Sequence, residues 1–330
     1  MINRRAFLRQ TFAAGAFVAS DMTPEPLSDP KYAQTRTIPV YAPKPETWRD
    51  DELTIAWVGH ATFLINFYGV RILTDPVLFD RVGVYAFGAT FGPTRLSPPA
   101  LSFAEMPNPD IVLLSHAHMD HCDMQTLESL TKRRPRGIAA ITSKNTSDVM
   151  RDCQWKSLQE LDWNESARVE TERGAVEVRA LEVRHFGWRL PGDPDRASGA
   201  KTGRSFNAYL LERGGKRIVF GGDTALTDAF KRAFHGDERG VDIAMMPIGA
   251  YHPWRNVHCT PEEALQMARD MNARFFAPMH CNTFPLGRES TFEPIERLVA
   301  AAKGTYPPAL ALTAIGKTFV LPKDDDKEKR

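Results

Sequence analysis

The stretch DIVLLSHAHMDHCD, residues 110–123, places four potential metal ligands directly after an apolar run. The run has the length and branched side chains of a buried strand, and His116, His118, Asp120 and His121 follow it. Imidazole and carboxylate groups suit zinc, and a turn at a strand end can aim alternating side chains at a common point. Because His116 and His118 share one direction, we expect them to bind one ion, and Asp120 and His121 to bind a second.

Three further ligand candidates lie where other apolar runs stop. His185 follows ALEVR, Asp223 follows RIVFGG, and His280 follows FFAPM. Taken singly, each has an ordinary structural interpretation, such as a core histidine, a turn or a helix N-cap. Together they supply partners that the four-ligand cluster still needs, so the sequence predicts a metal centre of seven residues.

The surrounding pattern predicts an α/β domain. Short runs rich in β-branched and aromatic residues predict antiparallel strands over 53–59, 62–67 and 70–76. Further strands are expected over 110–115, 138–142, 176–183, 207–212 and 217–220, and helices over 124–132, 225–234 and 261–271. Strands that alternate with helices without a low-complexity linker predict one domain over 45–322, preceded by a proline-rich linker at 21–44 and followed by a charged tail at 323–330. Each half reads as strands followed by a helix, which is compatible with a pseudo-twofold arrangement.

Composition excludes several classes of protein. The 330 residues contain 42 Lys+Arg against 41 Asp+Glu, so no basic excess exists to bind a nucleic-acid backbone. The apolar-leaning run 11–20 is shorter than the roughly 20 residues that cross a bilayer. The four cysteines form no C-x-x-C pair, so neither a zinc knuckle nor a disulfide framework is indicated. Cys122 and Cys281 each follow a proposed ligand; they either approach one another or the metals, or are small buried residues.

Residues 1–20, MINRRAFLRQTFAAGAFVAS, resemble a twin-arginine export signal. Arg4 and Arg5 precede a modest apolar centre and a small-residue end. We therefore expect export to the periplasm of a protein that has already folded and bound its metal. A basic start on a cytoplasmic protein is the alternative.

Longer motifs carry a family resemblance. AWVGHATFLI, ILTDP, GPTRLSP, DIVLLSHAHMDHCD, FGGDT, MMPIGAY, HCTPEEAL and HCNTF resemble the metallo-β-lactamase superfamily of binuclear metallohydrolases. More narrowly, they resemble the branch that includes N-acyl-phosphatidylethanolamine-hydrolysing phospholipase D, with the ascorbate-6-phosphate lactonases as a more distant branch. The resemblance covers residues 56–284 and implies a four-layer αββα sandwich with the metals at one edge between the two sheets.

The resemblance also implies how the ligands are shared between two Zn²⁺ ions, with other divalent metals as alternatives. It implies one ion on His116, His118 and His185, the other on Asp120, His121 and His280, and Asp223 bridging both. The chain departs from the branch after the last ligand, where HCNTF stands in place of the common His-Trp-Gly-Thr-Phe, and in the loop after His185. These departures do not change the proposed ligands, but the identity of the substrate does not follow from the resemblance.

The predicted activity is hydrolysis of a phosphodiester. A metal-bridging hydroxide, formed from a water whose pKa falls from 15.7 towards about 7, would attack phosphorus in line. Asp120 or Asp223 is the candidate to orient this nucleophile. His258, in VHCTPEE, matches an active-site histidine of the family and would contact the phosphate or the leaving oxygen, or else is a surface histidine before a helix.

Two further residues are candidates to contact the substrate or to support a ligand. Asp75, in ILTDP, either accepts a hydrogen bond from a ligand histidine or forms a plain turn before Pro76. His60, in AWVGHATFLI, has the same open status. His235 and His252 are expected not to be ligands.

The expected partner is a small-molecule or lipid phosphodiester, of which an N-acyl-phosphatidylethanolamine is the leading candidate. Hydrolysis of a lactone or another carbonyl ester at the same site is the first alternative, because both branches share the ligands. A non-catalytic metal-binding module is the second, although a structural zinc site closes with four ligands and does not need seven. The apolar loop 79–91 either lines an acyl-chain groove, dips into a lipid surface or caps the core.

Overall fold

The computed structural model describes residues 34–304 and 307–323. The export signal predicted at 1–20, most of the predicted linker and nearly all of the predicted charged tail lie outside the described residues. Residues 34–44, the described end of that linker, contact the domain. The Thr37 amide donates to the Leu96 carbonyl (2.9 Å), and the Gln34 amide group donates to the Glu289 carbonyl (2.7 Å).

Two seven-stranded sheets and a two-stranded hairpin make up the β-structure of the described residues. The first sheet has the spatial order β16 (Thr318–Val320), β1 (Leu53–Gly59), β2 (Thr62–Phe67), β3 (Val70–Thr74), β6 (Ile111–Leu113), β7 (Ala139–Ser143) and β8 (Ser157–Leu161). The second has the order β15 (Ala309–Leu310), β14 (Phe275–Met279), β13 (Ile243–Pro247), β12 (Lys216–Phe220), β11 (Ala208–Arg213), β10 (Gly174–Leu181) and β9 (Ser166–Thr171).

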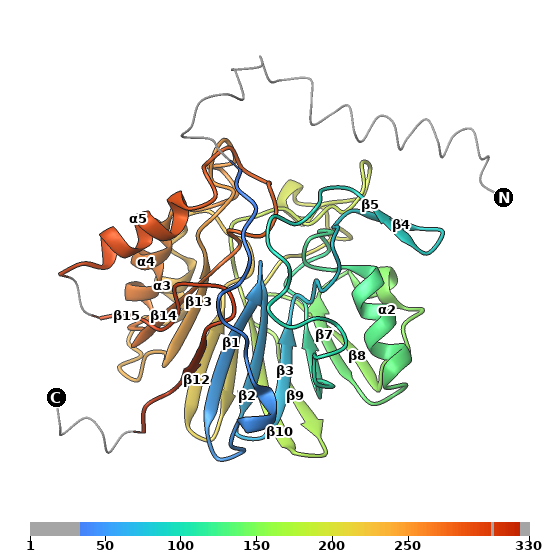
Figure 1. Ribbon diagram of the computed structural model, residues 1–330, viewed down its shortest axis with the longest axis horizontal. Coiled ribbons are helices and arrows are strands. Elements are labelled where there is room, and N and C mark those ends of the chain that lie inside the picture. The colour runs from blue at the N-terminus through green and yellow to red at the C-terminus, as the bar shows by residue number, and fades with distance from the viewer. Residues whose placement is uncertain (1–33, 305–306, 324–330) are drawn as a thin grey trace.

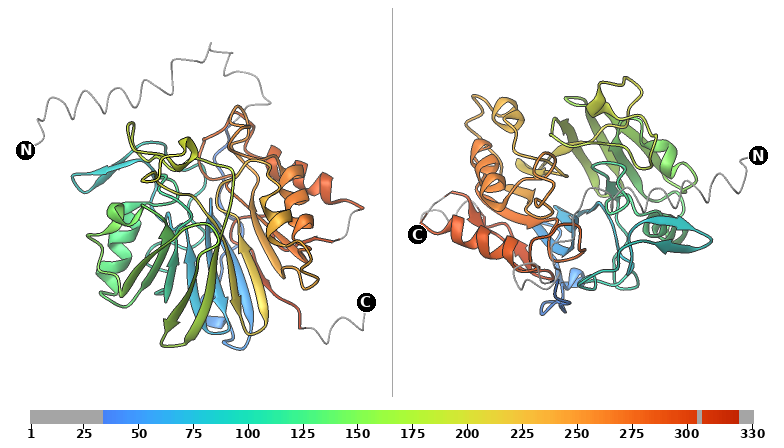
Figure 2. Two further views of the ribbon diagram at one scale, coloured as in Figure 1. Left: turned by 180° about the vertical axis from the view of Figure 1, so that it is seen from behind. Right: turned by 90° about the horizontal axis from the view of Figure 1, so that it is seen from above.

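Helices cover the outer faces of both sheets. Helix α2 (Met124–Arg133) lies against the first sheet, and α3 (Ala229–Ala233), α4 (Pro261–Asp270) and α5 (Glu293–Ala302) lie against the second (Figures 1 and 2). Two of these helices begin at strong N-caps. Asp123 accepts from the Thr126 amide at the start of α2, and Thr260 forms a capping box with Glu263 at the start of α4. The layers are helix, sheet, sheet and helix, which confirms the predicted αββα sandwich.

The main core fills the space between the two sheets. Trp57 and Phe63 of the first sheet and Tyr209 and Phe220 of the second are fully buried in one cluster. Complete burial of a side chain of this kind stabilises the fold by roughly 1.5–3 kcal/mol. Strand β1 is buried at every position, which explains why its sequence, LTIAWVG, is apolar with almost no alternation.

Strand direction brings the candidate ligands to one edge. Strands β1, β3 and β6 run in the same direction, because β1–β2 and β2–β3 pair antiparallel and β3–β6 pairs parallel. By the same reasoning β10, β12, β13 and β14 run together in the second sheet. The sheets touch at this edge, where His116 forms an isolated bridge with Phe206. Residues that follow these strands therefore meet between the sheets.

The two sheets repeat one pattern. In each, antiparallel strands lead to a central strand, β3 or β12, from which the pairing continues parallel. Asp75 directly follows β3, and Asp223 follows β12 after two glycines. This agrees with the pseudo-twofold arrangement suggested by the sequence.

Most predicted elements form within a few residues of the expected bounds, with three differences. The helix expected over 225–234 is shortened to α3, because Ala225 and Thr224 bond instead to the backbone of Arg184. The loop 77–99 contains the hairpin of β4 (Val84–Ala86) and β5 (Ala89–Phe91). Strands β8, β9, β13 (Ile243–Pro247), β15 and β16 and helix α5 were not predicted. The polar positions of β8 and β9 explain why an apolar pattern missed those two strands, and β15 and β16 have only two and three residues. None of the helices described has both the length and the apolar character needed to cross a membrane.

Candidate metal centre

The structure brings the seven predicted ligands together in two adjoining groups. In each group, the candidate ligand atoms all lie within 4.8 Å of one another. One group consists of His116, His118, His185 and Asp223, and the other of His60, Asp120, His121 and His280. The second group therefore contains one histidine, His60, that the sequence did not assign as a ligand.

In the first group, imidazole nitrogens face one another. His118 Nδ1 lies 2.8 Å from His116 Nε2 and 3.2 Å from His185 Nε2. The Oδ2 atom of Asp223 lies 3.9 Å from His116 Nε2 and 3.7 Å from His185 Nε2. Nitrogen lone pairs at these separations need a proton or a cation between them, so three imidazoles and a carboxylate surround one potential cation position.

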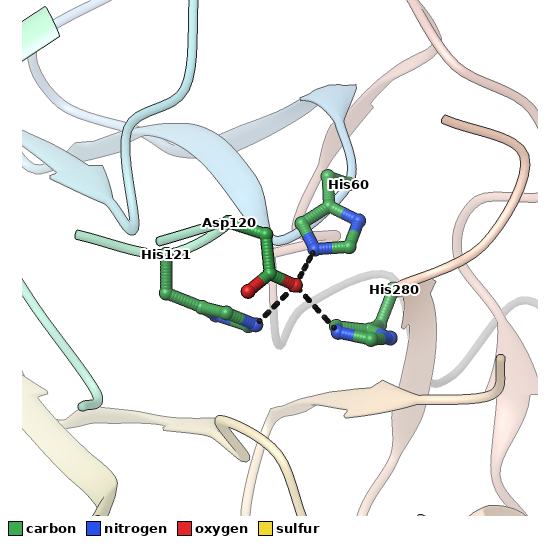
Figure 3. A group of neighbouring side chains, drawn as sticks. All are labelled: His60, Asp120, His121 and His280. Carbon is green, nitrogen blue, oxygen red and sulfur yellow. Dashed lines mark hydrogen bonds and ion pairs between the residues drawn. The ribbon is translucent and has the colours of Figure 1, made fainter. Parts of the chain in front are cut away.

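In the second group, three imidazoles converge on one carboxylate oxygen (Figure 3). Asp120 Oδ2 lies 2.9 Å from His60 Nε2, 3.3 Å from His280 Nε2 and 3.4 Å from His121 Nε2. The Oδ2 atom of Asp223 also reaches this group, at 3.0 Å from His280 Nε2 and 3.2 Å from His121 Nε2. One oxygen of Asp223 thus faces both groups, as expected of a bridging ligand.

Buried acceptors orient several of the ligand imidazoles. Asp75 accepts hydrogen bonds from the Ser115 amide (2.7 Å), the Ser115 hydroxyl (2.5 Å) and His121 Nδ1 (2.6 Å). The Ser115 hydroxyl donates its hydrogen to Asp75, so it accepts a hydrogen bond from His116 Nδ1 (2.8 Å). His185 Nδ1 donates to the Val257 carbonyl (2.9 Å). With Nδ1 protonated in each case, the Nε2 lone pairs are left free to bind a cation.

The electrostatics of the cluster favour bound positive charge. Burial favours the neutral acid, yet His121 and His280 hold the pKa of Asp223 well below its usual value, and the pKa of Asp120 is also held well below its usual value. Burial opposes the charged form of His280, but the carboxylates of Asp223 and Asp120, 3.0 and 3.3 Å from its Nε2, raise its pKa to about 9. By contrast, burial lowers the pKa of His118 to about 3. Asp223 is buried and Asp120 is partly buried, so carboxylates that stay ionised there need positive charge beside them, which a protonated imidazole or a bound metal ion can supply.

Several buried atoms in the cluster lack a hydrogen-bond partner among the described residues. They include Asp223 Oδ1, His121 Nε2 and His280 Nε2. Buried polar atoms without a partner are costly unless a ligand satisfies them. The donor set of imidazoles and carboxylates is the one that zinc and similar divalent ions prefer, so the residues fit a metal centre.

His258 lies at the side of this cluster. Its Nδ1 is 3.9 Å from Asp223 Oδ2, and its ring centroid is 5.1 Å from those of His185 and His280. It immediately precedes Cys259 and the N-cap Thr260 of α4, and it is 8% exposed. His258 is therefore a buried histidine next to the candidate ligands, and the interpretation as a surface histidine is wrong.

The cysteines contribute no ligand atom to the groups found among the described residues. Cys122 and Cys281 are both buried, and burial raises the pKa of the Cys122 thiol to about 11. A neutral thiol is a poor metal ligand. The structure agrees with the interpretation of both residues as small buried side chains, and His235 and His252 are also outside every group.

Arg189 supports the loop 117–122 that carries His118, Asp120 and His121, which is called the metal loop below. The sequence analysis did not identify this arginine. Its Nη1 donates to the carbonyls of Ala117 (2.6 Å) and Cys122 (2.9 Å), which flank the three ligands 118–121. Its own backbone amide is held by Asp193 (3.1 Å). A single arginine in a loop that resembles no known motif gives no signal in the sequence.

Comparison with known proteins places the chain among metallohydrolases. Residues 70–281 match the family model described as a beta-lactamase superfamily domain. An uncharacterized protein of Mycobacterium tuberculosis is 34% identical over 279 residues, which cover 80% of this chain and 68% of the relative. N-acyl-phosphatidylethanolamine-hydrolyzing phospholipase D 1 of Caenorhabditis elegans is 28% identical over 293 residues, covering 85% of this chain and 79% of the relative.

A metal-dependent hydrolase of Ligilactobacillus salivarius is 30% identical over 233 residues, covering 71% of this chain and 87% of the relative. Among solved structures, Igni18, a metallo hydrolase from Ignicoccus hospitalis, is 18% identical with a TM-score of 0.59. That alignment covers 82% of this chain and 99% of the other and shows the same fold.

Proposed function

Because the chain belongs to the metallo-β-lactamase superfamily and is a metal-dependent hydrolase, we propose that it cleaves a phosphodiester of the N-acyl-phosphatidylethanolamine type with two bound zinc ions. One observation carries the proposal of two ions: Asp223 Oδ2 faces imidazoles of both ligand groups. The similarity to the C. elegans phospholipase D supports the choice of a phosphodiester.

Two adjacent divalent ions would lower the pKa of a shared water and bind the charged oxygens of the substrate. The residues of the chain prepare the site for these ions. Asp75 fixes the His121 ring, and Arg189 holds the loop that carries His118, Asp120 and His121. Since Nδ1 of His258 has no partner among the described residues, this ring can turn a nitrogen towards substrate without breaking a protein hydrogen bond.

Apolar side chains next to the metal cluster support a lipid substrate. Phe186 lies against His118, with ring centroids 4.3 Å apart, and Trp188 follows at 6.3 Å with its side chain partly exposed. On the hairpin of the loop between β3 and β6, Phe87 is 97% exposed and Phe91 is 60% exposed. Exposed aromatic side chains can contact acyl chains or a lipid surface.

A substrate panel tests this function. Zinc-loaded protein is assayed with an N-acyl-phosphatidylethanolamine, an aryl phosphodiester and several lactones, beside a variant that combines His118→Ala with Asp223→Ala. We expect diester cleavage by the native chain and none by the variant. Turnover of lactones without diester cleavage would instead assign the carbonyl-ester chemistry of the related lactonases. Metal analysis in the same preparations is expected to give two zinc ions per chain.

We also propose that the protein reaches the periplasm through the twin-arginine route. The proposal rests on the sequence of residues 1–20. Replacing Arg4 and Arg5 with lysines is expected to leave the precursor in the cytoplasm, as fractionation would show. Unchanged export of this variant would contradict the assignment.

A further inference from the structure

His60 occupies the turn between β1 and β2, at the metal edge of the first sheet. Its side chain is 1% exposed, and its Nε2 lies 2.9 Å from Asp120 Oδ2. This contact is shorter than those of His121 and His280 with the same oxygen (Figure 3). Neither the pattern of metal ligands nor the proposed function accounts for a third imidazole at this carboxylate.

The backbone holds His60 in an uncommon conformation. Its φ is 50°, in the left-handed region, which a residue with a Cβ adopts only when its surroundings enforce it. The His60 amide donates to Thr283 Oγ1 (2.6 Å), and its carbonyl accepts from Trp57 Nε1 (2.8 Å) and from the His280 amide (3.1 Å). These bonds tie the turn to the segment that carries His280, so the ring is placed relative to both sheets.

Among the ion pairs of the described residues, His60 faces the carboxylate of Asp120, whereas the proposed ligands His121 and His280 face both Asp120 and Asp223. Asp223 Oδ2 has five imidazole nitrogens within 4.0 Å among the described residues, and they belong to His116, His121, His185, His258 and His280. His60 is not one of them. It contacts Asp120 Oδ2 instead, the oxygen that His121 and His280 also face.

The position of the proton follows from the partners of the ring. A neutral imidazole carries one hydrogen, on either Nδ1 or Nε2. Its Nδ1 is buried without a partner among the described residues, whereas Nε2 faces a carboxylate. A hydrogen on Nε2 makes a charge-assisted bond to Asp120, but a hydrogen on Nδ1 would be buried unpaired.

We propose that His60 is a positioning residue that donates its Nε2 hydrogen to Asp120 Oδ2 and holds this carboxylate for the second cation, without binding the cation itself. A carboxylate oxygen accepts along more than one direction, so the hydrogen bond leaves Asp120 free to bind metal. Loss of such an outer partner weakens metal binding by roughly 10–100-fold. The effect falls on the ion held by Asp120, His121 and His280, and the other ion keeps its affinity.

The test compares two His60 variants of similar size. His60→Gln retains an N–H donor near the position of Nε2, and His60→Met has none. Zinc dissociation constants are measured by competition with a chromophoric chelator, with His280→Ala as the control that removes a proposed ligand. We expect His60→Met to bind two ions with the weaker one released roughly 10–100-fold more readily, and His60→Gln to recover part of this loss.

Cobalt-substituted protein supplies a readout that does not depend on activity. The visible spectrum of Co²⁺ depends on the number of ligands, so His60→Met at saturating cobalt is expected to keep the native spectrum and two ions per chain. If His60→Met binds a single ion at every cobalt concentration, as His280→Ala is expected to do, His60 is a ligand and the proposal is wrong. Unchanged zinc affinity in His60→Met would overturn it as well. Neither measurement uses a substrate, so the result is independent of the proposed phosphodiesterase activity.

Discussion

Asp75 and Asp223 occupy corresponding places in the two halves of the molecule, but the carboxylate of Asp75 accepts protein hydrogen bonds and that of Asp223 faces the candidate metal ligands. Each follows the central strand of its sheet, β3 or β12, where antiparallel pairing gives way to parallel pairing. Both side chains are buried. Asp75 accepts three hydrogen bonds from Ser115 and His121, whereas Asp223 Oδ1 has no partner among the described residues and Oδ2 faces imidazoles.

The difference shows that donors near a carboxylate decide its role more than its place in the fold does. Asp75 is satisfied by a backbone amide, a hydroxyl and the outer nitrogen of a ligand imidazole. Asp223 faces the inner Nε2 atoms of such rings, and the outer Nδ1 atoms of three of them bond to Ser115, Asp75 and the Val257 carbonyl. The first carboxylate therefore stabilises the protein, and the second is available to a cation.

Asp223→Asn is expected to have the largest effect on metal binding. The amide has the shape of the carboxylate without its charge and has one oxygen in place of two, so the attraction of the side chain for both cations is weakened. We expect fewer than two zinc ions per chain and a loss of activity above the roughly 10–100-fold that an outer partner contributes. Zinc analysis after dialysis and turnover of the preferred substrate measure these effects. Retention of two tightly bound ions would exclude a bridging role for Asp223.

Asp75→Asn is expected to lower the stability of the metal-free protein more than Asp223→Asn does. The amide group would place hydrogens against the Ser115 hydroxyl and His121 Nδ1, so bonds to a buried charge are lost. Because a hydrogen bond to a charged group contributes about 1.5–3 kcal/mol, we expect the free energy of unfolding of the metal-free protein to fall by roughly 3 kcal/mol. Denaturant titration of the metal-free Asp75→Asn and Asp223→Asn variants measures and compares their free energies of unfolding. Equal stability of the two variants would remove the distinction drawn between these residues.

The sequence predicted the ligands better than it predicted what holds them. Four of the seven lie in one motif, HAHMDH, and the others follow apolar runs, so local pattern was sufficient to find them. The motif ILTDP marked Asp75 as a candidate acceptor for a ligand histidine, and the structure confirms this and identifies the histidine as His121. The contact of Arg189 with Ala117 joins residues distant in the chain, and no local pattern in the sequence indicates it.

His60 illustrates the same limit. Its motif, AWVGHATFLI, marked it for attention, but the open choice between a substrate contact and a supporting residue needed the distance to Asp120. The strands gave the opposite result. The run LTIAWVG predicted β1 correctly, because a strand buried on both faces has an almost continuous apolar sequence. Strand β9 has exposed polar positions, so its sequence gives no such apolar pattern.

Arg189→Met is expected to have an intermediate effect. The methionine retains the apolar stem but leaves the Ala117 and Cys122 carbonyls without their donor. We expect a loss of roughly 1–3 kcal/mol in the free energy of unfolding and a smaller decrease in zinc affinity than in Asp75→Asn. Arg184→Met is the matched control, since that side chain is exposed in the same loop. Equal effects of the two changes would show that Arg189 does not act through the metal loop.

Cys122→Ser and Cys281→Ser are expected to have the smallest effect on metal binding. Each cysteine neighbours a candidate ligand, but each belongs to a buried apolar cluster, Cys122 with Leu127 on the side of α2 and Cys281 between the sheets. A serine hydroxyl buried without a partner costs about 1–3 kcal/mol, so stability should fall while the chain still binds two zinc ions. Thermal unfolding and zinc analysis of the same samples separate the two quantities. Because burial raises the pKa of both thiols, a neutral sulfur is expected beside the cations, and loss of zinc in either variant would mean that the thiolate forms once metal is bound.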